Sequence, residues 1–368
     1  MVLIIMPTFI LNKRYWKFPH KFRCDNVQQN LYAKQIKSYE IMRMQLATRK
    51  SICQSWLKSE GQNIINQNLS YTERLPKAGE TLHGHTFLTG YGGKGANQCV
   101  AAARLGAKCA MIAKLGDDTW GSNYLKQLQT ENVNVDHVEQ CKGATTGIAQ
   151  ISVADSGENH IVIVVGANNL LSGEDVKKAK ALFETAKILI CQFETPLNAT
   201  LDALRAFKGI SILNAAPALA ETPSDLIKAA TIFCVNETEA ALTTGCGDIS
   251  TLEHAKTAMK KLLEMGANNV IITLGSLGAV YVRSENPLQF IHVPAIKVTK
   301  VVDTTGAGDA FIGALAFNMA RFRDSPWYNL IGAANEVAAY SVQHPGTQAS
   351  FPKPEQMQRV TDYTWLEI

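Results

Sequence analysis

The stretch VVDTTGAGDAFIGALAFNMARF, residues 301–322, joins the end of an apolar run to a helical pattern. Its two leading valines close a short apolar run of the kind that forms a buried strand. Phe311, Leu315 and Met319 then recur at helical spacing. The stretch therefore predicts a strand, a tight turn and an apolar helix, in that order.

Gly306 and Gly308 lie in the predicted turn, where a bare backbone can approach a ligand. The unpaired N–H groups and the positive end of the dipole at a helix start favour an anion such as phosphate. Asp309 is unsuited to holding an anion, but it could take a proton from a hydroxyl that attacks one. It could equally complement the helix dipole, and this stretch alone leaves both interpretations open.

The composition is that of an ordinary globular protein. The chain has 368 residues, 46% hydrophobic and 18% charged, enough for one large α/β domain or two smaller ones. No basic stripe and no apolar run of about 18 residues is present, so neither nucleic acid nor membrane is expected as a partner. The eight cysteines form no C-x-x-C pair. This favours reduced thiols in an intracellular protein and argues against a zinc site.

The first 66 residues differ from the rest. They hold eleven Lys/Arg against three acidic residues, although the net charge of the whole chain is only +4. Their order, apolar and then basic, is wrong for a secretory signal, whereas a mitochondrial presequence stays open. We predict a boundary near residue 66, with an atypical segment 1–66 followed by one domain over 67–368.

Apolar strands alternate with helical stretches after the boundary. Runs such as KILICQFE, TIFCVNE and NVIITLG are separated by helices predicted over 175–185 and 252–264. This alternation predicts a mainly parallel sheet, whose ligands gather at the carboxyl ends of the strands. Polar residues close these strands, namely Glu194, Asn214, Asn236, Glu239 and Thr273. Segments 69–92 and 145–165 interrupt the alternation and read as a lid or side sheet.

Two further motifs are ambiguous by themselves. Residues 90–107 match G-x-G-x-x-G, but no acidic residue follows at a strand end, and a Walker A loop would need Ser or Thr after Lys94. Lys94 and Asn97 could instead grip a small polar ligand, or the stretch could be a plain glycine turn. Asn236 and Glu239 could form a helix cap or could orient a hydrated Mg²⁺.

Together, these stretches resemble the ribokinase family of sugar and nucleoside kinases, the PfkB group. The family's two signature motifs appear as GGKGANQCVAAARLGA and DTTGAGDAFIGAL, with NETE, LNAAPA, TLGSLG and HPGTQAS in the family's order. The resemblance covers roughly residues 69–354. It implies an α/β three-layer sandwich with a mainly parallel sheet and a small β lid. GGKGANQ and GTQAS point to members that phosphorylate D-ribose at O5 with ATP, giving D-ribose 5-phosphate for ribose catabolism.

The resemblance also implies roles for residues of this chain. Asp309 looks like the general base, and the amides of Gly306, Ala307 and Gly308 look like the anion hole. The sugar would be bound by Gly92, Gly93, Lys94, Asn97, Glu194 and Asp309. ATP and its Mg²⁺ would be surrounded by Asn236, Glu239, Thr273, Gly275, Ser276, Gly278, Gly308 and Asn335. A potassium ion would activate the enzyme from ligands mapping to Asp303, Thr305, Ser341, His344, Gly346 and Ser350.

Members of the family often dimerise through the lid, so the resemblance implies a homodimer. It also implies a cytoplasmic location, with the nucleus left open. One departure concerns the strand and Gly-Ser-x-Asn-x-Asp stretch that open the family's fold. Their Asp falls near Gln67 here, no Asp is present, and no clean strand precedes it. The opening MVLII could be that strand, with residues 10–66 inserted after it. The segment could also come from an alternative first exon or a faulty gene model.

The departure keeps two alternatives open beside the ribose kinase. The chain could phosphorylate another sugar or a nucleoside. It could also be a catalytically weak member that binds nucleotide or a partner and has an impaired sugar site.

Overall fold

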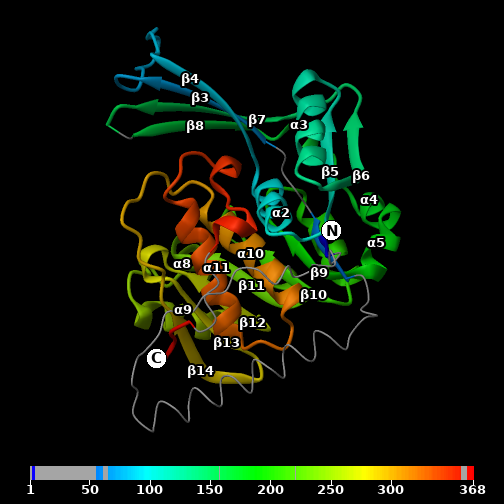
Figure 1. Cartoon of the computed structure of the whole chain (residues 1–368), viewed down its shortest axis with the longest axis vertical. Helices are drawn as coiled ribbons and strands as arrows, with labels where there is room; N and C mark the ends of the chain where they lie inside the picture. Colours follow the sequence, from blue (N-terminus) through cyan, green and yellow to red (C-terminus); the bar gives the residue numbers. More distant parts are fainter. Residues whose placement is uncertain (1, 5–54, 61–64, 157, 220, 358–362) are drawn as a thin grey trace, which may run out of the picture. The chain divides into compact units, whose positions relative to one another are not determined.

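A long mixed sheet forms the middle layer of the fold (Figure 1). The computed structural model describes residues 2–4, 55–60, 65–156, 158–219, 221–357 and 363–368. Within these residues the sheet has the strand order β15-β14-β13-β12-β11-β10-β9-β2-β1-β5-β6. Its parallel part comprises β6 (Asn134–Cys141), β5 (Cys109–Gly116), β2 (Ser55–Glu60), β9 (Ala186–Cys191), β10 (Ile210–Asn214), β11 (Ile232–Asn236) and β12 (Asn269–Thr273).

Antiparallel strands extend the sheet beyond β12. They are β13 (Ala279–Arg283), β14 (Asn286–Val293) and the C-terminal β15 (Leu366–Glu367). The short β1 (Val2–Ile4) also pairs antiparallel, with β2 and β5. The parallel strands alternate with helices along the chain, as the sequence predicts for right-handed crossovers.

Helices cover both faces of the sheet, because successive side chains of each buried strand point to opposite faces. Ile188 and Ile190 of β9 pack in one core, while Leu189 and Cys191 pack in the other. The first core contains α2 (Lys94–Arg104), α3 (Thr119–Thr130), α10 (Ala307–Arg321) and α11 (Trp327–Ser341). The second contains α4 (Gly173–Lys178), α5 (Lys180–Thr185), α6 (Leu197–Ala206), α7 (Ser224–Ala229), α8 (Glu237–Thr244) and α9 (Leu252–Glu264).

A smaller sheet stands apart in Figure 1, with the order β4-β3-β7-β8. Its strands are β4 (Thr86–Gly92), β3 (Ile65–Thr72), β7 (Gly147–Ala154) and β8 (Asn159–Val164). These strands lie in or beside the two segments for which the sequence predicts a lid. The remaining short elements are the 3₁₀ turns η1 (Gly166–Leu170), η2 (Gly275–Leu277), η3 (Gln348–Ser350) and η4 (Pro354–Gln356).

The start of the chain differs from expectation in one respect. The sequence shows no clean strand just ahead of Gln67, yet β2 lies there and pairs in parallel with β5 and β9. Its sequence, SWLKSE, has neither an apolar run nor strict alternation, so the local pattern hides it. The opening apolar residues do form a strand, but β1 runs antiparallel beside β2. The domain boundary near residue 66 stays a prediction, since residues 5–54 of the segment before it lie outside the described residues.

No helix among the described residues combines the length and the apolar character needed to cross a bilayer.

Candidate active site

A cavity of about 160 Å³ opens at the carboxyl ends of the parallel strands. Neighbouring strands place their last residues side by side there, since Asn236 of β11 pairs with Thr273 of β12. The start of α10 faces these strand ends. The lining residues are Lys94, Asn214, Ala216, Cys234, Val235, Asn236, Glu239, Thr273, Gly306, Gly308, Asp309 and Ile312. The structure therefore brings together most of the catalytic and nucleotide residues that the sequence singles out.

The helix α10 begins at this cavity with glycines for a structural reason. Its N-cap Gly306 has φ 79°, a left-handed backbone that favours glycine. A β-carbon at Gly306 would also collide with the side chain of Thr347. Gly308 has open space around it, and no side chain caps the helix. The Ala307 N–H donates to the Thr304 carbonyl at 3.2 Å, so Gly306 and Gly308 supply the N–H groups of this turn that suit an anion best.

Asp309 lies in the first turn of α10 with only 7% of its surface exposed. Its Oδ2 accepts a hydrogen bond from Asn97 Nδ2 at 2.9 Å, and its Oδ1 accepts one from Gln98 Nε2 at 2.8 Å. Burial raises the pKa of this carboxyl, although the charge of Lys94 and the two amides oppose the rise. A raised pKa and a fixed orientation suit a group that accepts a proton.

Lys94 and Glu194 meet on the sugar side of the predicted site. The backbone N–H of Lys94 donates to Glu194 Oε2 at 2.8 Å. Burial raises the pKa of Glu194 to about 7, against the lowering effect of Lys94. Burial lowers the pKa of the Lys94 ammonium, but nearby carboxylates, with Asp309 first, raise it by more. The Lys94 ammonium therefore stays charged, because the carboxylates of Asp309, Glu194 and Glu239 lie near it.

Asn236 and Glu239 form the helix cap that is one of the two roles predicted for them. Asn236 Oδ1 accepts from the Glu239 N–H at 2.8 Å, and Glu239 Oε2 accepts from the Asn236 N–H at 2.9 Å. The pair is thus a capping box for α8. Both residues also line the cavity, and burial raises the pKa of Glu239. The capping role holds the carboxylate in place and is compatible with a role in the site.

The remaining sugar residues lie at the start of α2. The Gly92 carbonyl accepts a hydrogen bond from the Tyr124 hydroxyl at 2.6 Å, and Gly93 is the helix N-cap with φ 94°. Asn97 lies one turn into the helix, in contact with Asp309. None of the three lines the cavity, and Asn97 connects this turn to Asp309.

The remaining nucleotide residues lie outside the cavity lining. Gly275 and Ser276 are exposed in η2, directly after β12, and Gly278 follows them as a buried residue with φ 96°. Asn335 Nδ2 donates to the carbonyls of Val293 and Pro294 at 3.0 and 3.1 Å. Its amide nitrogen is therefore occupied within the fold.

The predicted potassium ligands come from two loops that Asp303 joins. Its Oδ1 accepts from the Thr305 N–H and its Oδ2 from the Gly346 N–H, both at 2.9 Å. Burial raises the pKa of Asp303, but these donors lower it by more. Ser350 Oγ donates to the Thr347 carbonyl at 2.7 Å.

The other two predicted ligands lie at the end of α11. Ser341 Oγ donates to the Ala338 carbonyl at 2.8 Å, and His344 Nδ1 lies 3.0 Å from the Tyr340 carbonyl. The described residues contain no cluster of three His, Cys, Asp or Glu side chains that could hold a metal.

Sequence reasoning missed Gln98, which bonds Asp309, and also Gln348 and Tyr124, which are connected to Asp309 through Asn97. Gln98 bonds both Asp309 and Asn214, with its Nε2 2.9 Å from Asn214 Oδ1. Gln348 Nε2 donates to Asn97 Oδ1 at 3.1 Å and to the Tyr124 hydroxyl at 2.9 Å. Gln98 directly follows Asn97 in a quoted motif, which is the one signal that could have found it. Gln348 lies in HPGTQAS, but that motif pointed to potassium and not to Asp309, and no motif contains Tyr124.

The chain is similar to known kinases over most of its length. Residues 61–354 match the family described as pfkB family carbohydrate kinase. Mouse ribokinase is 45% identical over 287 residues, 77% of this chain and 88% of the mouse protein. Salmonella typhi deoxyribokinase is 38% identical over 299 residues, 80% of this chain and 95% of that protein. The solved structure of Arabidopsis thaliana ribokinase complexed with ribose and ATP is 29% identical, with a TM-score of 0.76, covering 83% of this chain and 97% of that one.

Proposed function

The chain belongs to the pfkB family of carbohydrate kinases, and we propose that it transfers the γ-phosphoryl group of ATP to the O5 hydroxyl of D-ribose. The observation that carries the proposal is the buried Asp309 carboxylate, which lies beside Lys94 at the uncapped start of α10. The mouse and Arabidopsis ribokinases support ribose and ATP as the substrates.

The proposed transfer uses Asp309, Lys94 and the start of α10, which line the same cavity. The O5 hydroxyl of ribose gives its proton to Asp309 while its oxygen bonds to the γ-phosphorus. The bond from that phosphorus to the bridging oxygen breaks, and ADP leaves. The N–H groups of residues 306–308 and the ammonium of Lys94 offset the charge on the phosphoryl oxygens. Positioning and electrostatics supply most of the catalysis in such a reaction.

The sugar lies against the start of α2 in this proposal. Asn97 donates to Asp309 one turn into the helix, and the Lys94 N–H donates to Glu194. The proposed sugar residues are therefore Gly92, Gly93, Lys94, Asn97 and Glu194. Glu194 is placed to accept hydrogen bonds from sugar hydroxyls in its ionised form. Gln67, which packs its side chain against Gly92, stands where a family carboxylate is expected.

The nucleotide lies along the ends of β11 and β12. Asn236, Glu239 and Thr273 face its phosphates, and Gly275, Ser276 and Gly278 form a wall beside them. Asn335 shapes this region by holding the backbone at 293–294. Glu239 and Asn236 suit a Mg²⁺ that keeps several waters and is bound mainly through ATP. When bound, Mg²⁺ would neutralise charge on the phosphates.

Potassium fits the loop pair that Asp303 joins. Asp303 supplies a carboxylate with a depressed pKa, and oxygen ligands are what such a cation needs. Thr347 Oγ1 is buried without a hydrogen-bond partner among the described residues, on the loop that packs against Gly306. Bound potassium would steady both loops and add positive potential near the anion hole.

The small sheet supports a homodimer. Its strands β4 and β8 expose Phe87, Leu88 and the run 161–164, each with more than half of its surface accessible. Exposed apolar side chains gathered on one small sheet favour a protein–protein contact. We assign this surface, the lid patch, to a second copy of the same chain.

Two observations favour 2-deoxyribose as an alternative sugar. Gln67 replaces the expected carboxylate, and a deoxyribokinase is among the similar proteins. An amide holds a sugar hydroxyl less strongly than a carboxylate does, so loss of one hydroxyl costs less binding. We therefore include 2-deoxyribose as the alternative sugar.

The test is a coupled ADP-release assay with ribose, 2-deoxyribose, fructose and adenosine side by side. Ribose should give the highest kcat/KM, and Asp309→Asn should lower kcat by about 10²–10⁴-fold while ATP still binds, because the base is lost and the anion hole stays. Asp324→Asn, on an exposed turn, is the matched control. Wild-type turnover in Asp309→Asn would overturn the assignment of the base, and a preference for another sugar would overturn the substrate.

A further inference from the structure

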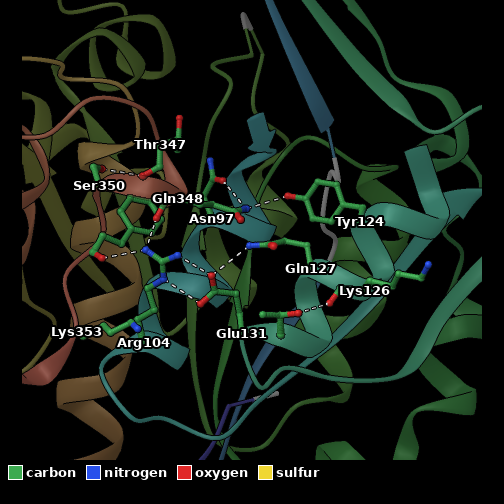
Figure 2. Close-up of polar contacts among 12 residues, drawn as sticks. Asn97, Arg104, Tyr124, Lys126, Gln127, Glu131, Thr347, Gln348, Ser350 and Lys353 are labelled. Atoms are coloured by element: carbon green, nitrogen blue, oxygen red, sulfur yellow. Dashed lines mark hydrogen bonds and ion pairs between the residues drawn. The ribbon is translucent and has the colours of Figure 1, made fainter. Parts of the chain in front are cut away.

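A line of side-chain hydrogen bonds connects η3 to Asp309 through Asn97. Figure 2 shows the part of it that joins Gln348 to Asn97 and Tyr124. Gln348 Nε2 lies 3.1 Å from Asn97 Oδ1, and Asn97 Nδ2 lies 2.9 Å from Asp309 Oδ2. Gln348 also donates to the Tyr124 hydroxyl at 2.9 Å. These four residues are at most 7% exposed. Bulk water therefore competes little for the bonds, which strengthens them relative to surface contacts.

The chemistry of the end groups fixes the direction of every bond. A carboxylate accepts only, so Asn97 must turn its NH₂ toward Asp309 and its carbonyl toward Gln348. The Tyr124 hydroxyl donates to the Gly92 carbonyl at 2.6 Å, so its oxygen accepts from Gln348. Gln348 must then donate to both neighbours. Glutamate has almost the same shape but, when ionised, has no N–H to give.

The backbone of η3 is tied to the same helix that carries Asn97. Arg104, in the last turn of α2, makes two hydrogen bonds to the Glu131 carboxylate, at 2.9 and 2.6 Å. Its Nη1 donates to the carbonyls of Gln348 and Phe351 (Figure 2). The other end of the loop is held by the bond from the Gly346 N–H to Asp303. Gln348 therefore sits between the predicted potassium loop and the proposed base.

We propose that Gln348 is a positioning residue for the reaction: it holds the amide of Asn97 in the one orientation that directs its NH₂ at Asp309. This proposal rests on the proposed function of Asp309 as the base. The HPGTQAS loop, residues 344–350, would then couple the predicted potassium site to the orientation of the Asp309 carboxylate through Gln348 and Asn97. Gln348 touches neither substrate nor the reacting atoms in this account.

A double-mutant cycle in the full chain tests the proposal. Gln348→Met keeps the side-chain volume and removes the donor, and we expect kcat to fall about fivefold, the size of one neutral hydrogen bond. Thermal unfolding of each variant accompanies the kinetics. If Gln348 acts through Asn97, the same change in an Asn97→Ala background should alter kcat less than twofold, because no amide is left to orient. A purely structural role would cost the same factor in both backgrounds.

Gln348→Glu is the second variant and should lower kcat more than Gln348→Met, because it also brings a like charge toward Asp309. Gln343→Leu is the control, since its amide bonds only the Ala339 carbonyl one turn earlier, at 2.9 Å. Wild-type kcat in Gln348→Met, or equal factors in the two backgrounds, overturns the proposal. The proposed base fails separately, through wild-type turnover in Asp309→Asn.

Discussion

Gln67 stands near the position where the ribokinase family pattern places an Asp that binds the sugar. It lies in β3 opposite Gly90, and a β-carbon at Gly92 would collide with its side-chain amide. The Gln67 side chain therefore reaches the turn at Gly92, which is one of the predicted sugar-binding residues. Its neighbours Asn66 and Asn68 alternate to the other face of the strand.

Gln67→Asp should lower the KM for ribose several-fold and leave the KM for ATP little changed. A hydrogen bond to a charged group contributes roughly 1.5–3 kcal/mol, against about 1 kcal/mol for a neutral one. Asn68→Asp is the matched control, because its side chain points away from Gly92. Steady-state kinetics with both substrates varied measure the effect. If Asn68→Asp improves ribose binding and Gln67→Asp does not, the register assigned here is wrong.

The turn before α10 is an element whose shape depends on one glycine. Gly306 needs a left-handed backbone and also leaves no room for a side chain against Thr347. Gly247 has a similar φ of 71° but open space around it. Alanine substitutions at Gly306 and Gly247 therefore distinguish two effects. Both introduce backbone strain, and only the one at Gly306 also displaces the loop at Thr347.

Gly306→Ala should lower kcat at least tenfold, because the loop must shift and the N–H groups of the anion hole move with it. Gly247→Ala should lose only the roughly 1 kcal/mol of backbone strain and keep its activity, whereas Gly306→Ala also has the collision with Thr347. Thermal unfolding and the ADP-release assay on both variants make the comparison. Equal activities would remove the turn from the catalytic account.

The proposed potassium site lies on the two loops that Asp303 joins. Turnover in potassium buffer should exceed turnover in sodium or choline buffer at equal ionic strength, because a bound cation steadies the 303–308 loop. Asp303→Asn removes the charge, so its activity should respond little to the choice of cation. Rates that are equal in all three buffers for the wild type would contradict a potassium site.

The elements also show which parts of the site a local pattern can reveal. The helix start at Gly306, the capping box of α8 and the polar strand ends were all visible in the sequence, because each depends on neighbours within a few residues. Gln348 was not, because its contact with Asn97 spans 251 positions of the chain. The pattern around Gln348 contains no trace of the partner that gives it a role.

At the scale of the whole molecule, the lid patch should decide the assembly. Val162 lies on β8 with 64% of its surface exposed. Val162→Lys should convert the dimer to a monomer in sedimentation velocity, because a charge would then be buried against apolar side chains. Leu288→Lys, at an 86% exposed position on β14 of the other sheet, is the control and should stay dimeric. A wild type that sediments as a monomer would exclude the proposed interface.

The sequence by itself determined the family, the three-layer class of the fold, and Asp309 with its glycine turn. The comparisons and the sheet order confirm the first two. These features are local, since strand periodicity, helix starts and turn glycines depend on neighbours in the chain. Only the tertiary structure placed β2 between β5 and β9, because the sheet pairing of SWLKSE is supplied by distant strands. It alone also brought Gln98 to Asp309 and Gln348 to Asn97, since hydrogen bonds between side chains of different elements exist only after the chain has folded.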